Sequence, residues 1–215
     1  METRIVYEAY PKTPVDEFVT DLEYEFSDAP HDLLVHNVLR VVASMCEQSN
    51  ILRRTALVRT QAGVPNYTFE APDNMQVIAL LSICPVGGAH ATAPIVRLTT
   101  APQAICHAPM NSVWVEKKEL IFSAPGNRDI FRVEMSVKPT YQTCELDTCL
   151  LTDYYETLCL GVRSLMFDMA DKPWSSLQRA ALARQEFYRA CSDNAVRAMT
   201  RNQRGAFRVR RPRAF

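Results

Sequence analysis

Cysteine and histidine are the residue types in this chain with the widest chemical potential, because thiolates and imidazoles bind zinc and serve as nucleophile and base. Cys106 and His107 are adjacent, and Cys144 and Cys149 follow. Structural zinc sites combine closely spaced ligand pairs, and no second pair accompanies Cys144 and Cys149. A cysteine nucleophile with a histidine base stays open, but no catalytic context surrounds it. We expect no metal, no cofactor and no enzymatic activity.

The cysteines as a set favour another interpretation. Their number is odd, and they are scattered through apolar stretches, which is typical of reduced, buried thiols rather than of a disulfide framework. Of the histidines, His36 falls on an expected amphipathic helix and is predicted to lie at its surface or boundary. The seven cysteines are Cys46, Cys84, Cys106, Cys144, Cys149, Cys159 and Cys191.

The last fifteen residues, 201–215, carry six arginines and no acid in a chain whose formal net charge is zero. Three functions stay open for this basic arm: a solubilising tail, a nucleic-acid-binding arm, and a docking arm on an acidic or polar groove of another protein. Interleaved apolar residues favour docking, because they add anchors to bidentate guanidinium contacts. The expected docking residues are Arg204, Phe207, Arg208, Val209, Arg210, Arg211, Arg213 and Phe215.

The N-terminal part reads as two helices. Thr13 is placed to cap a first helix that begins at Pro14, and apolar residues at helical spacing continue to Leu22. A second start at 27–30 leads into a longer amphipathic helix that is expected to end near Glu47. The first thirty residues carry eight acids against Arg4 and Lys12, so the two ends of the chain have opposite charge.

From Leu57 to Lys138 the apolar period changes to two, and prolines and glycines interrupt the segment. Expected strands are 76–84, 95–99, 113–122 and 130–137, with a turn at 125–127 joining the last two. The stretches 85–94 and 101–112 are candidate binding loops.

Helical spacing returns after Leu150. One helix is expected to open at Thr152 or Asp153, with a stripe formed by Tyr155, Leu158, Val162, Leu165 and Met169. A break at 171–174 separates it from a last helix of about 25 residues, which a capping box at 175–178 opens. The apolar stripe of that helix is expected to be Leu177, Ala181, Phe187, Tyr188, Cys191, Ala195 and Ala198.

These elements predict an α+β fold. Each helical end has one apolar face and needs the other as cover. We therefore expect a helical bundle formed by residues 1–52 plus 150–200, an inserted β-rich module of sandwich or barrel type at 53–149, and an extended basic C-terminal arm at 201–215. No run approaches the roughly 20 apolar residues that span a bilayer, and the first residues lack a signal-peptide layout, so we expect no membrane partner and synthesis in the cytosol.

In this order of elements the chain resembles the head-to-tail adaptor proteins of tailed bacteriophages, the group that includes tail tubular protein A of short-tailed phages. The resemblance rests on the segment from Ser27 to Leu34, the edge from Asn66 to Phe69, and above all the segment from Tyr154 to Ala195. In that last segment it is carried by Tyr155, Gly161, Val162, Leu165, Met169, Lys172, Pro173, Trp174, Ser175, Ala181, Phe187 and Ala195.

The resemblance implies a non-enzymatic virion protein at the head-tail junction, assembled in the host cytoplasm. Such adaptors form a homo-oligomeric ring, commonly a dodecamer, between the portal protein and the nozzle or tail-tube protein, and genomic DNA passes through without sequence-specific recognition. The helices that pack between subunits would carry Tyr155, Leu158, Trp174, Phe187 and Tyr188. The arm is unusually rich in arginine, which keeps open whether it also touches DNA. The alternative is a small nucleic-acid-binding factor that uses this tail.

Overall fold

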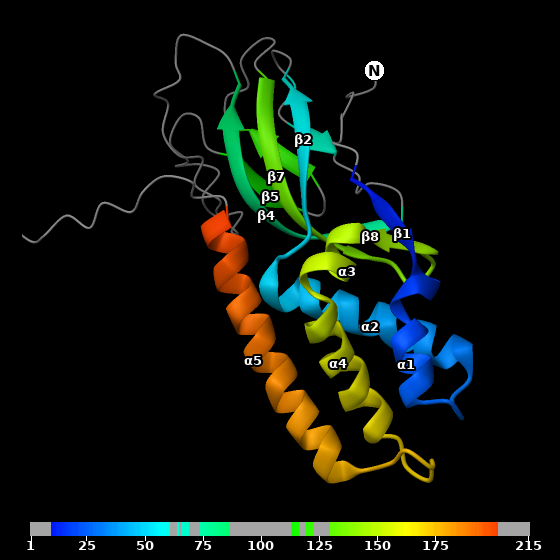
Figure 1. Ribbon diagram of the computed structural model, residues 1–215. Helices are drawn as coiled ribbons and strands as arrows, with labels where there is room; N and C mark the ends of the chain where they lie inside the picture. Colours follow the sequence, from blue (N-terminus) through cyan, green and yellow to red (C-terminus); the bar gives the residue numbers. More distant parts are fainter. Residues whose placement is uncertain are drawn as a thin grey trace, which may run out of the picture.

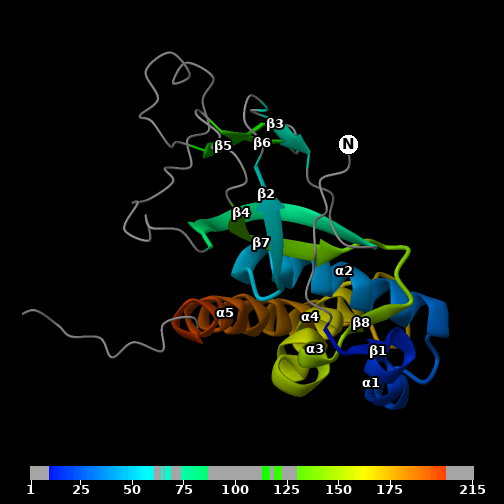
Figure 2. The same ribbon diagram turned by 90° about the horizontal axis from the view of Figure 1, so that it is seen from above.

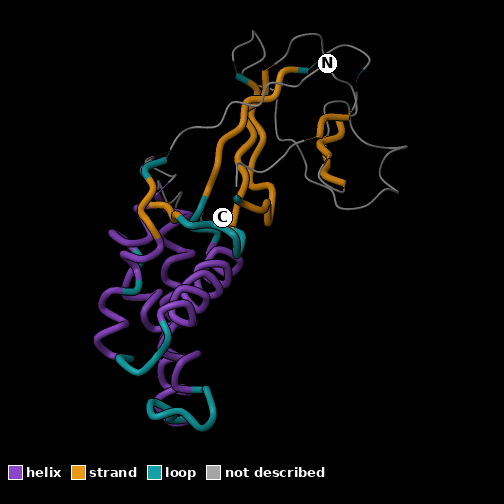
Figure 3. Tube along the Cα trace, turned by 90° about the vertical axis from the view of Figure 1, so that its right-hand side faces the viewer, coloured by secondary structure: helices purple, strands orange, loops and turns teal. Residues whose placement is uncertain are grey.

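The computed structural model describes residues 10–60, 64, 66–68, 74–86, 113–116, 119–122 and 130–201, and these form a mixed α+β fold, as predicted. Helices gather at one end of the molecule, with two short strands beside them, and the other strands lie towards the opposite end (Figures 1 and 3). The helices are η1 (Val15–Phe18, a 3-10 turn), α1 (Thr20–Glu25), α2 (His31–Ser49), α3 (Thr148–Asp153), α4 (Tyr155–Phe167) and α5 (Leu177–Arg201). The strands are β1 (Lys12–Pro14), β2 (Arg53–Arg59), β3 (Asn66–Thr68), β4 (Met75–Pro85), β5 (Val113–Glu116), β6 (Glu119–Phe122), β7 (Ile130–Pro139) and β8 (Glu145–Asp147).

Helix α2 is the central element, because it packs against α4 and α5 on one side and against β7 on the other. Its first and last residues agree with those predicted from the sequence to within two residues, and its apolar residues lie on the predicted buried side. Asn50 ends it in the left-handed conformation, and the amide of Asn50 bonds the Cys46 carbonyl at 2.9 Å. Val38 and Val42 are fully buried. The N-terminal and C-terminal helices therefore do cover one another.

Gly161 sets how closely the helices approach. A Cβ atom at this position of α4 would lie well inside van der Waals distance of Val41 on α2, and 2.9 Å from Cε2 of Phe187 on α5. Only a residue without a side chain fits where the three helices meet. This glycine is therefore a packing requirement of the fold.

The main sheet has the antiparallel order β2-β7-β4, with β7 in the centre. Val133, Met135 and Val137 of β7 are fully buried and face the helices with Ala56 of β2, so helices and sheet share one hydrophobic core. Two register shifts in β4, at Val77/Ala79 and Leu80/Ser82, mark β-bulges. Viewed from above, the sheet lies on the face of α2 that points away from α4 and α5 (Figure 2).

The expected strand 113–122 is instead two strands, β5 and β6, which pair with each other in a separate sheet of order β3-β6-β5. Neither strand pairs with β7, whose partners are β2 and β4. The strand expected at 76–84 is confirmed as β4. The sandwich or barrel packing of residues 53–149, and the division of the chain into units, stay predictions.

The expected helix at Thr13 and Pro14 was wrong. These residues form β1, which pairs with β8, and the Thr13 hydroxyl contacts the Thr148 hydroxyl at 2.9 Å. The Val15 amide bonds the Cys144 carbonyl at 3.0 Å. Pairing with a distant strand overrides the local capping signal, and helical structure begins only at η1.

The first C-terminal helix opens earlier than expected and is interrupted at Tyr154, so α3 and α4 are separate. Helix α5 has the expected length of 25 residues. The Ser176 hydroxyl accepts a bond from the Arg179 amide at 3.4 Å, one residue beyond the expected cap. The buried stripe of α5 is shifted from the expected one: Leu177, Ala181 and Tyr188 are exposed, and the buried residues are Ala180, Ala183, Phe187, Cys191, Asn194 and Ala198.

Several expectations lie outside the described residues: the strand 95–99, the loop 101–112, most of the loop 85–94, the turn 125–127, and the arm beyond Arg201. None of the helices in the described part of the chain is both long enough and apolar enough to span a bilayer.

Candidate functional site

The residues predicted to pack between subunits have different environments. Leu158 and Phe187 are buried in the chain's own core, at 0% and 5% exposure. Trp174 packs edge-on against Phe26, with ring centroids 6.3 Å apart. Tyr155 is half-buried, and Tyr188 is 52% exposed. Of this set, Tyr188 has the surface that a neighbouring subunit could contact. All eight predicted docking residues of the arm lie outside the described residues.

The outer face of α5 carries large apolar side chains in solvent, which we call the α5 face. It consists of Leu177, Leu182, Tyr188 and Val196, exposed by 76%, 58%, 52% and 62%, together with Ala181 and Arg189. Leu177, Ala181 and Tyr188 follow at spacings of four and seven residues, which aligns them along one side of the helix. Clustered exposed apolar residues are typical of an interaction surface.

A second exposed surface belongs to η1, α1 and the start of α2, residues 15–32, which we call the acidic face. This segment holds seven acids and no lysine or arginine. Tyr24 is 84% exposed among them. The acids are Asp16, Glu17, Asp21, Glu23, Glu25, Asp28 and Asp32.

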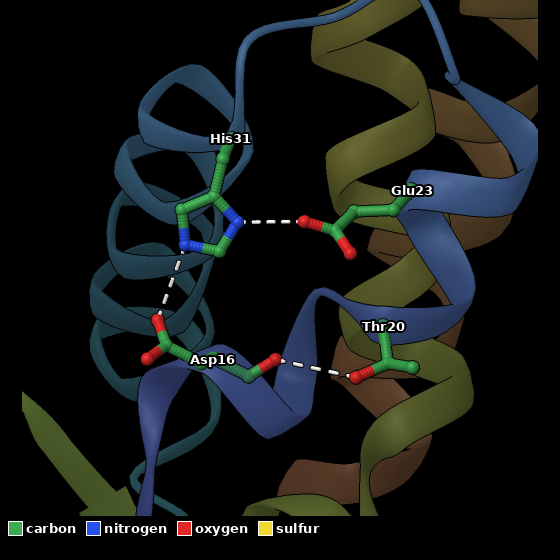
Figure 4. Close-up of polar contacts among 4 residues, drawn as sticks. All are labelled: Asp16, Thr20, Glu23 and His31. Carbon is green, nitrogen blue, oxygen red and sulfur yellow. Dashed lines mark hydrogen bonds and ion pairs between the residues drawn. The ribbon is translucent and has the colours of Figure 1, made fainter.

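His31 lies within the acidic face between two carboxylates (Figure 4). Its Nδ1 is 2.6 Å from Glu23 Oε1, and its Nε2 is 3.2 Å from Asp16 Oδ1. Both ring nitrogens thus face acceptors, so the arrangement suits the doubly protonated imidazolium, which donates to both. The bond to Glu23, with that to Asp16, raises the pKa of His31 above its ordinary value. The ring connects η1, α1 and α2 through these two contacts.

We predict that His31→Asn destabilises the protein at mildly acidic pH and has little effect at alkaline pH. A raised pKa means that the folded state binds the proton more tightly, so the stabilisation is fully present below the unfolded value of about 6.5 and is lost as pH rises through the folded value. Thermal unfolding between pH 5.5 and 9 measures this. The control is His36→Asn, because His36 stacks on Tyr141 at 5.9 Å instead. A pH-independent effect of His31→Asn would contradict the assignment.

Other carboxylates of the acidic face connect it to α4 and α5. The Tyr155 hydroxyl donates to Asp21 Oδ2 at 3.1 Å, and Arg163 Nε donates to Glu25 Oε2 at 2.7 Å. Arg179 of α5 reaches the same Glu25 carboxylate at 3.8 Å. These contacts fix α1 beside α4 while leaving Glu17, Tyr24 and Asp28 at the surface.

A buried ion pair connects the main sheet to β8, the partner of the N-terminal strand β1. Arg54 of β2 donates through Nη2 to both oxygens of Asp147 in β8, at 2.6 and 2.7 Å. The two side chains are only 4% and 2% exposed. The Arg54 guanidinium also lies 4.0 Å from the centroid of the Tyr10 ring. Both charges are compensated, so the pair holds β1, β2 and β8 together.

Three buried thiols, those of Cys46, Cys159 and Cys191, are not activated for nucleophilic chemistry. Burial raises the pKa of Cys46 and of Cys159, and raises that of Cys191 to about 11, so these three stay protonated at neutral pH. Their burial agrees with the sequence, whereas Cys84 and Cys144 are exposed, which the sequence did not indicate. Among the described residues, no three cysteine, histidine or acidic side chains are grouped to hold a metal ion. Cys106 and His107 lie outside these residues.

No protein-family model matches the chain, and none of the curated proteins matches it significantly. The candidate site therefore rests on the two exposed faces and on the arm.

The sequence indicated the acidic segment through its charge, and the resemblance named Tyr188 for subunit packing, but the other residues of the α5 face were missed. Leu182 and Val196 were in no predicted stripe, and Leu177 and Tyr188 were assigned to the buried one. The sequence of α5 does indicate this face, because apolar residues occur on more than one side of the helix. A helix that buries a single stripe needs apolar residues on only one side.

Proposed function

We propose that the chain is a head-to-tail adaptor: a non-enzymatic virion protein that forms a homo-oligomeric ring, joins the portal to the tail, and surrounds a passage for DNA. The observation that carries this proposal is the packing of α2 against α4 and α5, which makes one helical body from the two ends of the chain with the strands inserted between them. This is the arrangement that the resemblance to phage adaptors implies.

In this function the helices form the bundle that packs side by side around the ring. The inserted β-rich segment, as a sandwich-like or barrel-like module, faces the tail protein. The basic arm follows α5 and docks on the portal protein. A ring multiplies each weak docking contact by the number of subunits, so avidity holds the joint without one strong site.

The arm supplies the test. Deleting residues 205–215 is expected to leave the subunit folded and to abolish its attachment to the portal protein. A matched variant that keeps every arginine but replaces Phe207, Val209 and Phe215 with serine separates docking from phosphate binding, because phosphates need no apolar anchors. Co-sedimentation of each variant with portal rings is the measurement.

Docking predicts that both the deletion and the serine variant lose attachment. If the deletion variant still attaches, the role of the arm is wrong. If the serine variant attaches normally and the full chain binds random duplex DNA with a salt slope near −5, the arm is a nucleic-acid-binding segment instead.

A further inference from the structure

We propose that the segment before Tyr10 adds a fourth strand to the main sheet, antiparallel to β2, and so closes an edge that the described residues leave open. The occupant of this edge is a named part of the same chain, residues 2–8, which lie outside the described residues. This inference goes beyond the adaptor function and does not depend on it.

Strand β2 lies at one edge of the main sheet, and β7 is its strand partner in the described part of the chain. Just before β2, the Val137 amide bonds the Leu52 carbonyl at 3.0 Å, and the register of β2 and β7 continues this pair. In an antiparallel ladder, every second residue directs its backbone groups away from the partner strand. In β2 these residues are Arg53, Thr55, Leu57 and Arg59.

The backbone groups at this edge are largely without partners. The Arg53 carbonyl accepts a bond from Arg54 Nη1 at 2.9 Å. For the outward amides and carbonyls of Thr55, Leu57 and Arg59, the described residues offer no hydrogen-bond partner. The side chain of Leu57 is also 36% exposed. The edge of β2 is therefore a template on which another strand can pair.

The two edges of the main sheet differ in their protection. Native proteins protect sheet edges with bulges, prolines or a covering segment. Strand β4, at the other edge, has two register shifts and ends at Pro85. Strand β2 pairs with β7 over seven residues without a register shift and contains no proline. A covering segment is the protection that remains for β2.

Tyr10 brings the N-terminal segment to this edge. Its ring centroid lies 4.0 Å from the guanidinium of Arg54, which also reaches the outward carbonyl of Arg53. The Pro11 carbonyl accepts from the Thr148 amide at 3.0 Å, which fixes the chain beside the start of β2. In Figure 1, β1 runs towards α1, whereas β2 runs away from the helices. A chain traced back from Tyr10 along β2 is therefore antiparallel to it.

The segment has the length and composition of the missing strand. At about 3.3 Å per residue, residues 2–8 span about 23 Å, which is also the length of the seven-residue β2. Residues 1–10 contain no proline and no glycine. The β-branched and aromatic residues within 2–8, which favour strands, are Thr3, Ile5, Val6 and Tyr7.

Amide hydrogen exchange of the full-length chain, followed by nuclear magnetic resonance, tests the proposal. The edge amides are those of Thr55, Leu57 and Arg59, which only an added strand would protect. The amides of Arg54, Ala56 and Val58 point to β7 and form the internal control, because they are expected to stay protected in every variant.

Two variants remove the added strand. One lacks residues 2–8, and the other carries Val6→Pro with Tyr7→Pro, which removes two adjacent amides. The matched control, Val6→Thr with Tyr7→Thr, keeps the amides and the strand propensity. We expect the edge amides to exchange at least about 10-fold faster in the deletion and proline variants than in the wild type and the threonine control.

Three results would overturn the proposal. Equal exchange of the edge amides in the wild type and the deletion variant would show that residues 2–8 do not cover them. Loss of protection at all six amides in both variants would show that the segment stabilises the whole sheet rather than one edge. Protection that disappears when the wild type is diluted would show that a neighbouring copy supplies the strand.

Discussion

Replacing Asp147 with alanine is expected to lower the free energy of unfolding by about 3–5 kcal/mol, because Arg54 would be left as an uncompensated buried charge. Asp147 is 2% exposed, and its two oxygens accept from the same Arg54 nitrogen. For a chain of this size, such a loss shifts the melting temperature by roughly 10 °C. Urea unfolding monitored by circular dichroism measures the change.

Two further variants sharpen this prediction. Glu47→Ala is the control, since it breaks the more exposed pair with Lys138 and should cost at most about 1 kcal/mol. The double variant Arg54→Met with Asp147→Leu should be more stable than Asp147→Ala alone, because two apolar side chains remove both charges. If Asp147→Ala unfolds within about 1 kcal/mol of the wild type, the ion pair does not hold this junction.

Gly161→Ala is expected to destabilise the protein by about 1–3 kcal/mol. Alanine in an exposed helix interior would stabilise by up to about 1 kcal/mol relative to glycine, so the expected sign is opposite to that of helix propensity. The reason is packing: the added Cβ would overlap Val41 and lie 2.9 Å from Phe187 Cε2. Both residues are buried and cannot move into solvent.

A double-mutant cycle tests this cause. Val41→Ala removes the methyl group that the new Cβ would meet, so Gly161→Ala combined with Val41→Ala should cost less than the sum of the two single variants. Gln185→Ala, on the exposed side of α5, is the surface control and should change stability by no more than about 0.5 kcal/mol. Additive costs would mean that the overlap with Val41 is not the source.

The elements that could be predicted from the sequence are those whose pattern reflects one buried face. The strand β7 alternates between apolar and polar residues and is confirmed, and α2 and α5 have the expected lengths. The expected helix start at Thr13 was wrong because Thr13 pairs with Leu146 of β8 and its hydroxyl contacts that of Thr148, 135 residues away. Local signals at Thr13 and Pro14 are the same in a helix start and in a short strand.

The phase of α5 illustrates a second limit. Alanine and large apolar residues occur around most of the helix, so spacing alone supports more than one stripe. Packing partners on α4 determine which side of α5 is buried. Phe187 packs against Gly161, and Asn194 donates to the Thr157 hydroxyl at 3.1 Å. These contacts turn Tyr188 and Leu177 outwards, where the sequence placed them inside.

The candidate site was predictable only in part. Charge counts show the acidic segment and the basic arm directly. The Arg54–Asp147 pair joins residues 93 positions apart, and nothing local in either segment indicates it. The α5 face emerges only when the buried face of the helix is known.

The most direct test of the central claim is electron microscopy of the purified full-length chain, alone and with the portal protein. The proposed function predicts closed rings of this chain that cap the portal and leave an axial channel wide enough for duplex DNA. Isolated monomers under both conditions, or closed assemblies without a channel, would contradict it.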